Sequence, residues 1–369
     1  MKIAIEALGI HSAGGGRTAT LTVLENLEKI DQDNQYTLYL SQFEASIQSK
    51  NFHQVIVPFK NRLLLRMWAQ FTLPLATRGQ DLVHFMKNLG AFGIVAPSMV
   101  TMYDLTTLVH PELFPALDVW YWRHIQKRTL ENADRIIAIS KTTAEDLINF
   151  YHLSPDKFRV IYPAIASHFG PASEIAIEGV RKKYGLPHRY LIHVGHIDRK
   201  KNLTFLVNVF ADFCRRADFD GNLVLVGEVY PKTMDHILVP TIEKLGIQNR
   251  VTFTNFVPDK ELPALYSGAF AAVFPSLHEG FGLAPVEAMA CGTPLIAHRA
   301  GAIPEVVGDA AIILDKLDSD AFTDVLQDLY TSSHRWHELR RLGLERSRRY
   351  SGETTARQTL ELYQEVANH

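Results

Sequence analysis

Short apolar runs recur along the chain, and stretches with helical spacing of apolar positions lie between them. In the first half, apolar runs predict strands at 2–8, 36–40, 54–58, 82–85, 99–104 and 134–140, and the run at 160–164 closes the first domain. Helical spacing predicts helices at 18–30, 61–76 and 119–133, and Ser140 is placed to cap a further helix that starts near Thr142. This alternation of strand and helix is typical of a Rossmann-like domain.

The same alternation begins again after residue 190. Apolar runs predict strands at 190–195, 222–227, 251–253, 271–274 and 294–297, with helices from residue 203, at 261–269 and at 354–367. Between the two sets, residues 164–180 carry Pro171, Ser173 and small side chains without strong periodicity, which predicts a linker. The fold class that follows is α/β, with two Rossmann-like domains.

Composition narrows the class of protein. The 369 residues are 47% hydrophobic and 21% charged, which is enough apolar material for two globular domains. The net charge of −2 gives no general attraction to nucleic acid, so no nucleic-acid partner is expected. No apolar run approaches the roughly 20 residues that span a bilayer. Two cysteines, and a first strand where a signal peptide would stand, predict a cytoplasmic protein.

The stretch from 271 to 298 carries the most specific chemistry. A strand leads into the glycine-bearing loop EGFGL (279–283), and a short helix with Pro285 in its first turn follows. Loop amides and the helix dipole form a site for an anion. Glu279 and Glu287 repel phosphate but accept hydrogen bonds from sugar hydroxyls, so a nucleotide sugar suits the whole site. The alternative is an ordinary helix with an acidic residue near its start.

This stretch resembles the signature of family 4 glycosyltransferases. In that family, two glutamates separated by seven residues stand within a run similar to PSxxEGFGLPxxEAMxCGxPV, and residues 275–294 read PSLHEGFGLAPVEAMACGTP. Ala284 stands where proline is usual. The runs GHIDRKKN (195–202) and AIPEVVG (302–308) are also similar to the family's pattern. The resemblance implies a retaining enzyme of the GT-B fold, with two facing Rossmann-like domains.

The resemblance also implies the domain limits and the site. It places an acceptor-side domain at 1–170, a nucleotide-sugar domain at 171–350 and a C-terminal helix at 351–369 that crosses back to the first domain. Lys201 would contact the diphosphate, Glu279 the sugar hydroxyls and Glu287 the ribose diol. The expected catalytic residues are Lys201, Glu279, Tyr103 and Asp104, and the expected donor-binding residues are Gly15, Gly16, His196, Phe256, Val257, Gly280, Phe281, Gly282, Leu283 and Glu287.

Four parts of this site leave room for another interpretation. The family often has His-Asp where Tyr103-Asp104 stands, and tyrosine donates a hydrogen bond but is no base near neutral pH. The family often has arginine at His196, so the phosphate clamp is expected to be weaker or sensitive to pH. The glycine loop at 11–17 lies against the donor phosphates in the family, but it also suits a tight turn. The basic run at 199–201 also suits solvated surface.

The predicted function is transfer of a hexose, with retention, from a nucleotide sugar to a saccharide or lipid-linked saccharide in polysaccharide assembly. UDP-glucose is the first donor candidate and GDP-mannose the second. A sugar-nucleotide epimerase and a nucleotide-sugar-binding protein of weak activity are the alternatives.

Three Asp-x-Asp triplets occur, at 31–33, 218–220 and 318–320. Each flanks a predicted helix or strand, where aspartate favours turns, so no metal is expected. The apolar stretch 61–76, with Arg62 and Arg66, suits a core helix or an amphipathic helix at the inner face of the membrane.

Overall fold

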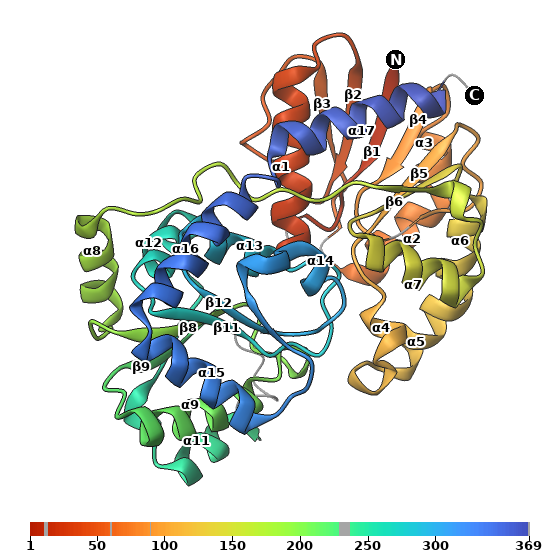
Figure 1. Cartoon of the computed structure of the whole chain (residues 1–369). Coiled ribbons are helices and arrows are strands. Elements are labelled where there is room, and N and C mark those ends of the chain that lie inside the picture. Colours follow the sequence, from red (N-terminus) through yellow and green to blue (C-terminus); the bar gives the residue numbers. More distant parts are fainter. Residues whose placement is uncertain (11–13, 60, 89, 229–236, 368–369) are drawn as a thin grey trace. The chain divides into compact units, whose positions relative to one another are not determined.

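The structure is a computed structural model that describes residues 1–10, 14–59, 61–88, 90–228 and 237–367. It divides into two compact units, one formed by Met1–Ala166 with Tyr350–His369 and the other by Ser167–Arg349. Each unit contains its own parallel sheet with helices packed around it (Figure 1). The prediction of an α/β fold with two Rossmann-like domains is confirmed, and so is the return of the last helix to the first of them.

The first unit is built on seven parallel strands in the order β3-β2-β1-β4-β5-β6-β7. Its strands are β1 (Lys2–Glu6), β2 (Gln35–Leu40), β3 (Phe52–Ile56), β4 (Leu82–Phe85), β5 (Ser98–Met102), β6 (Arg135–Ala138) and β7 (Phe158–Val160). Its helices are α1 (Gly15–Ile30), α2 (Arg62–Phe71), α3 (Leu73–Ala76), α4 (Thr106–Val109), α5 (Ala116–Tyr121), α6 (Lys127–Asn132), α7 (Lys141–Tyr151) and α17 (Gly352–Ala367). The direction of strand addition reverses between β1 and β4.

The C-terminal helix α17 is anchored in the core of the first unit and packs against α1 (Figure 1). The hydroxyl of Tyr363 lies 2.7 Å from Nδ1 of His84 on β4, and both side chains are buried. Nε2 of His84 lies 2.7 Å from the hydroxyl of Thr101 on β5. Because these buried polar groups are paired, α17 is held in the first unit by buried hydrogen bonds as well as by apolar contacts.

The second unit is built on six parallel strands in the order β10-β9-β8-β11-β12-β13. Its strands are β8 (Tyr190–Val194), β9 (Asn222–Val226), β10 (Val251–Asn255), β11 (Ala271–Phe274), β12 (Leu295–His298) and β13 (Ile312–Leu314). Its helices are α8 (Glu174–Tyr184), α9 (Leu203–Ala217), α11 (Val239–Leu245), α12 (Leu262–Ser267), α13 (Leu283–Ala290), α14 (Ile303–Val307), α15 (Ser319–Thr331) and α16 (Ser333–Ser347).

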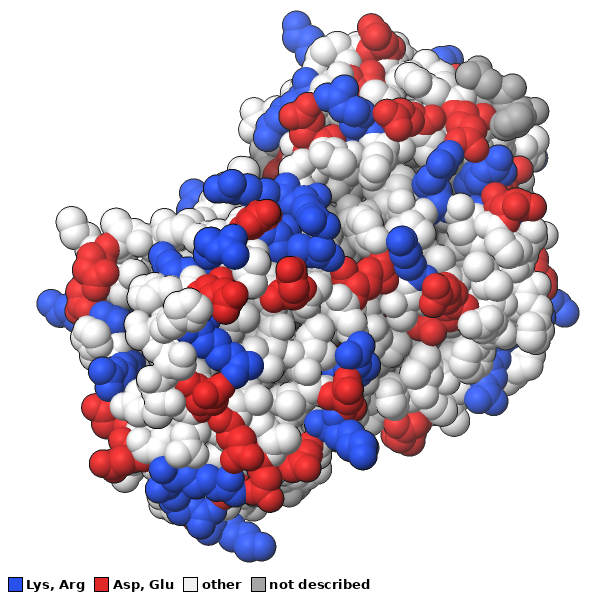
Figure 2. All heavy atoms as spheres, in the orientation of Figure 1, with Lys and Arg blue, Asp and Glu red and all other residues white. Residues whose placement is uncertain are grey.

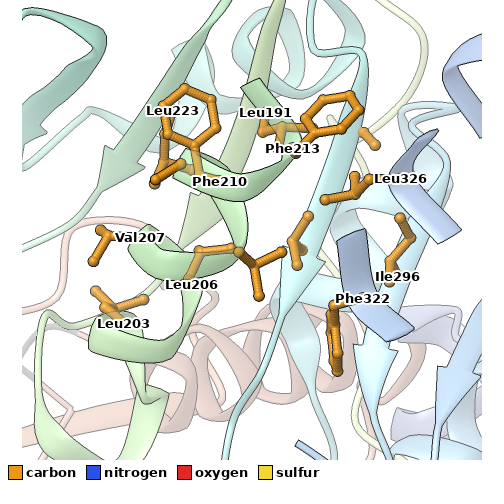
Figure 3. Packing of buried hydrophobic residues seen from close by; sticks show 14 of the residues in the cluster. Leu191, Leu203, Leu206, Val207, Phe210, Phe213, Leu223, Ile296, Phe322 and Leu326 are labelled. Carbon is orange, nitrogen blue, oxygen red and sulfur yellow. The ribbon is translucent and has the colours of Figure 1, made fainter. Parts of the chain in front are cut away.

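Helix α9 supplies much of the apolar core of the second unit. Its residues Leu206, Phe210 and Phe213 are fully buried and pack with side chains of the sheet and of α15 (Figure 3). The i, i+4 and i, i+3 spacing of these three residues places them on one face of the helix. This packing fixes the start of α9, where the loop that carries Lys201 joins the helix.

Two local predictions are wrong. The expected linker to residue 180 contains α8, because Ser173 accepts the Ala176 amide at 3.3 Å and Val180 is buried on the helix. The single helix expected at 61–76 is two helices, α2 and α3, because Pro74 has no amide hydrogen to continue the ladder. The strand expected at 54–58 is present two residues earlier, as β3.

The surface carries both signs of charge. On the face drawn in Figure 2, Lys and Arg side chains are interspersed with Asp and Glu on each unit, in keeping with the net charge of −2. Within the described residues, no helix combines the length and apolar character needed to cross a bilayer.

Candidate active site

The expected site residues fall on both units. Gly15, Gly16, Tyr103 and Asp104 belong to the first unit, and all the others belong to the second. In the second unit, Lys201 follows β8 and Glu279 follows β11. These two strands are neighbours at the point where the strand order reverses, and parallel strands end at the same edge of a sheet. Ligands of open α/β sheets bind in the crevice at this position.

Lys201 and Glu279 form a direct ion pair. The ammonium nitrogen of Lys201 lies 2.5 Å from Oε1 of Glu279, and the ammonium nitrogen of Lys200 lies 3.9 Å from Oε2. The two partners of the close pair are mostly buried, with side chains 19% and 11% exposed. The short helix 199–201 is started by Asp198, whose carboxylate accepts the Lys201 amide at 3.1 Å. The pair therefore joins two loops that are far apart in the sequence.

The two glutamates of the motif have opposite electrostatic environments. Burial alone would raise the pKa of Glu279, but the charges of Lys201 and Lys200 outweigh burial and bring that pKa down to about 2. Glu287 lies on α13, where burial raises the pKa of its carboxyl group to about 7. Its Oε2 accepts a hydrogen bond from the hydroxyl of Tyr266 on α12 at 3.1 Å. Glu279 is therefore a carboxylate near neutral pH, whereas Glu287 holds a proton much more readily.

The loop between the glutamates depends on two glycines, Gly301 packed against it and Gly282 within it. The backbone oxygen of Glu279 accepts the Ala302 amide at 2.8 Å. Gly301 has φ +54, and a Cβ there would lie 2.3 Å from that same oxygen. Gly282 precedes α13 with φ +95, a conformation that favours glycine.

The remaining expected residues of the loop differ in exposure. Gly280 and Phe281 are buried, whereas Gly282 and Leu283 are partly exposed. Phe281 retains only 3% of its exposure, so its ring belongs to the core. An amide of this loop that meets a donor phosphate is therefore expected at the exposed end, where α13 begins.

The two expected donor-binding residues that follow β10 also differ in exposure. Phe256 is 64% exposed, and Val257 is buried at 4%. Asn255, directly before them, has φ +58, and its carbonyl accepts the Gly227 amide at 3.0 Å. His196 is partly exposed beside Gly195, and its carbonyl accepts the Asp198 amide at 3.0 Å.

In the first unit, Tyr103 and Asp104 follow β5 and are partly buried. The hydroxyl of Tyr103 lies 2.8 Å from that of Thr20 on α1, and burial raises the pKa of Tyr103 to about 12. The same ring lines a small pocket of about 20 Å³ that His84 also lines. Asp104 accepts the Thr106 amide at 3.3 Å. Tyr103 therefore directs its hydroxyl to a partner inside the first unit.

The glycines of the first unit begin α1. Gly15 and Gly16 are its first two residues, after Gly14 with φ +122. A Cβ at Gly16 would lie 3.3 Å from Cε of Lys87, which follows β4. The ammonium of Lys87 donates to the carbonyl of Gly9 at 2.6 Å. Residues 11–13 of the predicted glycine loop lie outside the described part of the chain.

Comparison with known proteins agrees with this arrangement. Residues 177–346 match the family described as glycosyl transferases group 1, and residues 13–168 match the one described as glycosyltransferase family 4. The two matches together cover most of both units. The chain belongs to family 4 of the glycosyltransferases.

Three individual relatives of this glycosyltransferase have between 18% and 29% sequence identity to it. The O-antigen chain mannosyltransferase B of Escherichia coli is 29% identical over 72% of this chain and 70% of its own length. The serotype-specific mannosyltransferase WbdA of Escherichia coli is 29% identical over 75% of this chain, which spans only 34% of WbdA. The crystal structure of Anabaena HepE in complex with UDP-glucose has a TM-score of 0.81 at 18% identity, covering 99% of this chain and 100% of HepE, and shows a shared fold.

The Asp-x-Asp triplets of the glycosyltransferase have capping and turn contacts. Asp31 accepts hydrogen bonds from Asn34 and Tyr36. Asp318 precedes α15 and accepts the Asp320 amide at 2.9 Å, and Asp218 ends α9 with φ +48. In the described part of the chain, no group of three or more His, Cys, Asp or Glu side chains is arranged to hold a metal ion.

Sequence reasoning missed three residues of this neighbourhood. Lys200 adds a second positive charge beside Glu279, Tyr266 hydrogen-bonds Glu287, and His193 is buried on β8 next to the Lys201 loop. Lys200 belongs to the basic run at 199–201, so the sequence could have predicted that it lies near the site. Tyr266 and His193 lie inside apolar segments and carry no local signal, because only the strand and helix packing brings them to the site.

Proposed function

We propose that this glycosyltransferase transfers a hexose from a nucleotide sugar to a hydroxyl group, with retention at the anomeric carbon and without a metal ion. The observation that carries the proposal is the buried Lys201–Glu279 pair at the carboxyl edge of β8 and β11, with Glu287 on the helix that follows. A fixed cation and a helix N-terminus favour a leaving diphosphate, and carboxylates favour hydroxyls.

Each residue has a separate task in this proposal. Lys201 neutralises the charge that develops on the departing diphosphate, together with the exposed amides at the start of α13. Glu279 accepts hydrogen bonds from the hydroxyls of the transferred sugar, and Glu287 from the ribose diol. Because Lys201 and Glu279 are bonded to each other, donor binding must redirect both partners. Retention and metal independence rest on the family resemblance and on the cations that the site supplies.

We propose GDP-mannose as the donor, with UDP-glucose as the second candidate. Two relatives at 29% identity are mannosyltransferases, one of an O-antigen chain, and this supports mannose transfer in the assembly of a surface polysaccharide. The similarity to HepE bound to UDP-glucose, at 18% identity, supports the fold and leaves the donor open.

The test uses the purified protein with a panel of GDP-mannose, UDP-glucose and related nucleotide sugars. We expect slow release of nucleoside diphosphate from GDP-mannose, with water as acceptor, and equal rates with and without EDTA. Turnover of UDP-glucose alone would overturn the donor, and an EDTA-sensitive rate would overturn metal independence. An epimerised nucleotide sugar, or binding without turnover, would favour the two alternative functions.

We also propose that the acceptor is linked to lipid and that the first unit contacts the membrane surface. Leu64, Met67 and Phe71 on α2 and Leu75 on α3 are apolar and 45–73% exposed. Arg66 on the same helix lies 5.2 Å from the ring of Tyr121, the last residue of α5. An apolar face with basic neighbours is typical of helices that lie in a membrane interface.

Flotation with anionic lipid vesicles tests this contact. Phe71→Ser combined with Leu75→Ser is expected to remove most of the vesicle-bound protein. Phe43→Ser is the matched control. Phe43 is 67% exposed on the same unit, but it lies in the loop between β2 and β3 and not on α2 or α3. Equal flotation of the double variant and the control would contradict a membrane contact through α2 and α3.

A further inference from the structure

His193 is a buried histidine close to the Lys201–Glu279 pair. It is the fourth residue of β8 and is fully buried. Its Nδ1 lies 2.9 Å from the carbonyl oxygen of Val273 on β11. A carbonyl only accepts, so Nδ1 carries the proton and Nε2 presents a lone pair. Burial lowers the pKa of His193 to about 4, which keeps the ring neutral near pH 7.

The lone pair of Nε2 has no hydrogen-bond partner among the described residues. Unpaired acceptors in a protein interior are rare and cost free energy. The atom faces Gly195, where a Cβ would lie 3.5 Å from Nε2 and 3.3 Å from Cε of Lys201. Because residue 195 is glycine, no side chain stands at this position between the His193 nitrogen and the Lys201 side chain.

We propose that His193 is a positioning residue for Lys201, and that its Nε2 accepts a hydrogen bond from the Lys201 ammonium when a nucleoside diphosphate draws that ammonium away from Glu279. This inference rests on the proposed function. An ammonium group has three hydrogens to donate, and in the free protein Glu279 takes one of them. With the diphosphate bound, the Lys201 ammonium turns from Glu279 toward the phosphates, and a fixed acceptor on the protein orients it there.

A neutral acceptor suits this task better than a second carboxylate. An imidazole nitrogen orients the ammonium without cancelling its charge, so the full charge remains available to the diphosphate. The Lys201 and Glu279 charges both act on the His193 ring, which places the three groups within electrostatic reach of one another.

The competing explanation is that His193 only fills space. Its ring packs on Phe274 with centroids 5.1 Å apart. The two explanations predict opposite orders of nucleoside-diphosphate affinity for two substitutions. His193→Phe keeps the ring contact but removes the lone pair, whereas His193→Gln keeps an acceptor oxygen but loses the ring.

Calorimetric titration with GDP and UDP, together with the thermal midpoint of each variant, separates these explanations. We expect His193→Phe to keep its thermal midpoint and to bind nucleoside diphosphate about tenfold more weakly, as for loss of one hydrogen bond to a charged group. His193→Gln should bind more tightly than His193→Phe despite a lower midpoint. In a Lys201→Ala background, His193→Phe should have no further effect, because the partner is absent.

Two results would overturn the inference. One is wild-type affinity in a folded His193→Phe variant, and the other is an equal loss in the Lys201→Ala background. If wild-type protein binds no nucleoside diphosphate, the proposed function itself fails. Should His193→Phe not fold, nitrogen NMR of labelled wild-type histidines replaces it, with the His193 signal assigned by its absence from His193→Gln. Nucleoside diphosphate is expected to shift the Nε2 signal, and an unchanged signal would refute the contact.

Discussion

Replacement of Glu279 by glutamine is predicted to tighten the binding of nucleoside diphosphate while it slows turnover. The amide keeps the shape of the side chain but removes the charge that holds the Lys201 ammonium at 2.5 Å. A diphosphate then meets a lysine without a competing carboxylate. Turnover falls because the sugar hydroxyls lose a charged acceptor.

The size of the effect follows from the site's electrostatics. The Lys201 and Lys200 charges lower the pKa of Glu279 from 4.5 to about 2 against the opposing effect of burial. The net shift of about 2.5 units corresponds to about 3 kcal/mol, which gives the scale of what the lysine charges contribute beyond the cost of burial. Lys201 keeps part of its contact with the amide oxygen, so we expect a gain of about tenfold.

The same substitution removes stability with a defined pH dependence. Because the folded-state pKa of Glu279 lies below its ordinary value, the carboxylate stabilises the fold above about pH 4.5 and loses that effect as the pH falls toward 2. The thermal midpoint of Glu279→Gln should therefore lie below that of wild type at pH 7, and the difference should narrow below pH 4.5.

Calorimetry with GDP and UDP measures the affinity, and the donor assay measures turnover. Glu345→Gln is the matched control, because Glu345 forms an exposed pair with Arg341 at 3.4 Å and such pairs contribute little. It should change neither quantity. Weaker or equal diphosphate binding by Glu279→Gln would show that the pair does not compete with the ligand, and would refute the division of roles.

Three further predictions concern neighbouring residues. Lys201→Ala should lower turnover by about a hundredfold in a protein that still folds, with a lower thermal midpoint because the buried Glu279 loses its close partner. Unchanged turnover would remove Lys201 from the site. Donor affinity should weaken about tenfold from pH 8 to pH 6, because Glu287, with a pKa of about 7, must lose its proton to accept the ribose hydroxyls. Calorimetry with a nucleotide sugar checks this, and Glu287→Gln should abolish the slope. Gly301→Ala should lower both the thermal midpoint and donor binding, since its Cβ would lie 2.3 Å from the Glu279 oxygen. Normal midpoint and affinity in that variant would contradict the tight packing.

The fold class was predictable because its signal is local. Apolar runs and helical spacing predicted the strands, and the family resemblance supplied the return of the C-terminal helix, which its contacts with His84 explain. The errors arose where one strong local residue decided the outcome. Ser173 starts α8 in a stretch of weak periodicity, and Pro74 divides a region whose apolar pattern continues through it.

The site was only partly predictable. The motif predicted Lys201 and Glu279 separately, but their direct bond depends on β8 and β11 being neighbours, and the two residues are separated by 78 positions. The opposite pKa shifts of Glu279 and Glu287 depend on burial and on Lys200, which spacing alone does not give. The roles assigned to the site residues stay predictions.

The most direct test follows the first sugar released from an α-linked nucleotide sugar by time-resolved proton NMR. With GDP-mannose as donor and water as acceptor, wild-type protein is predicted to release α-mannose first, before the anomers equilibrate. Lys201→Ala should release almost none over the same period. Release of β-mannose first, or an equal rate from the Lys201→Ala variant, would contradict a retaining transfer at the Lys201–Glu279 site.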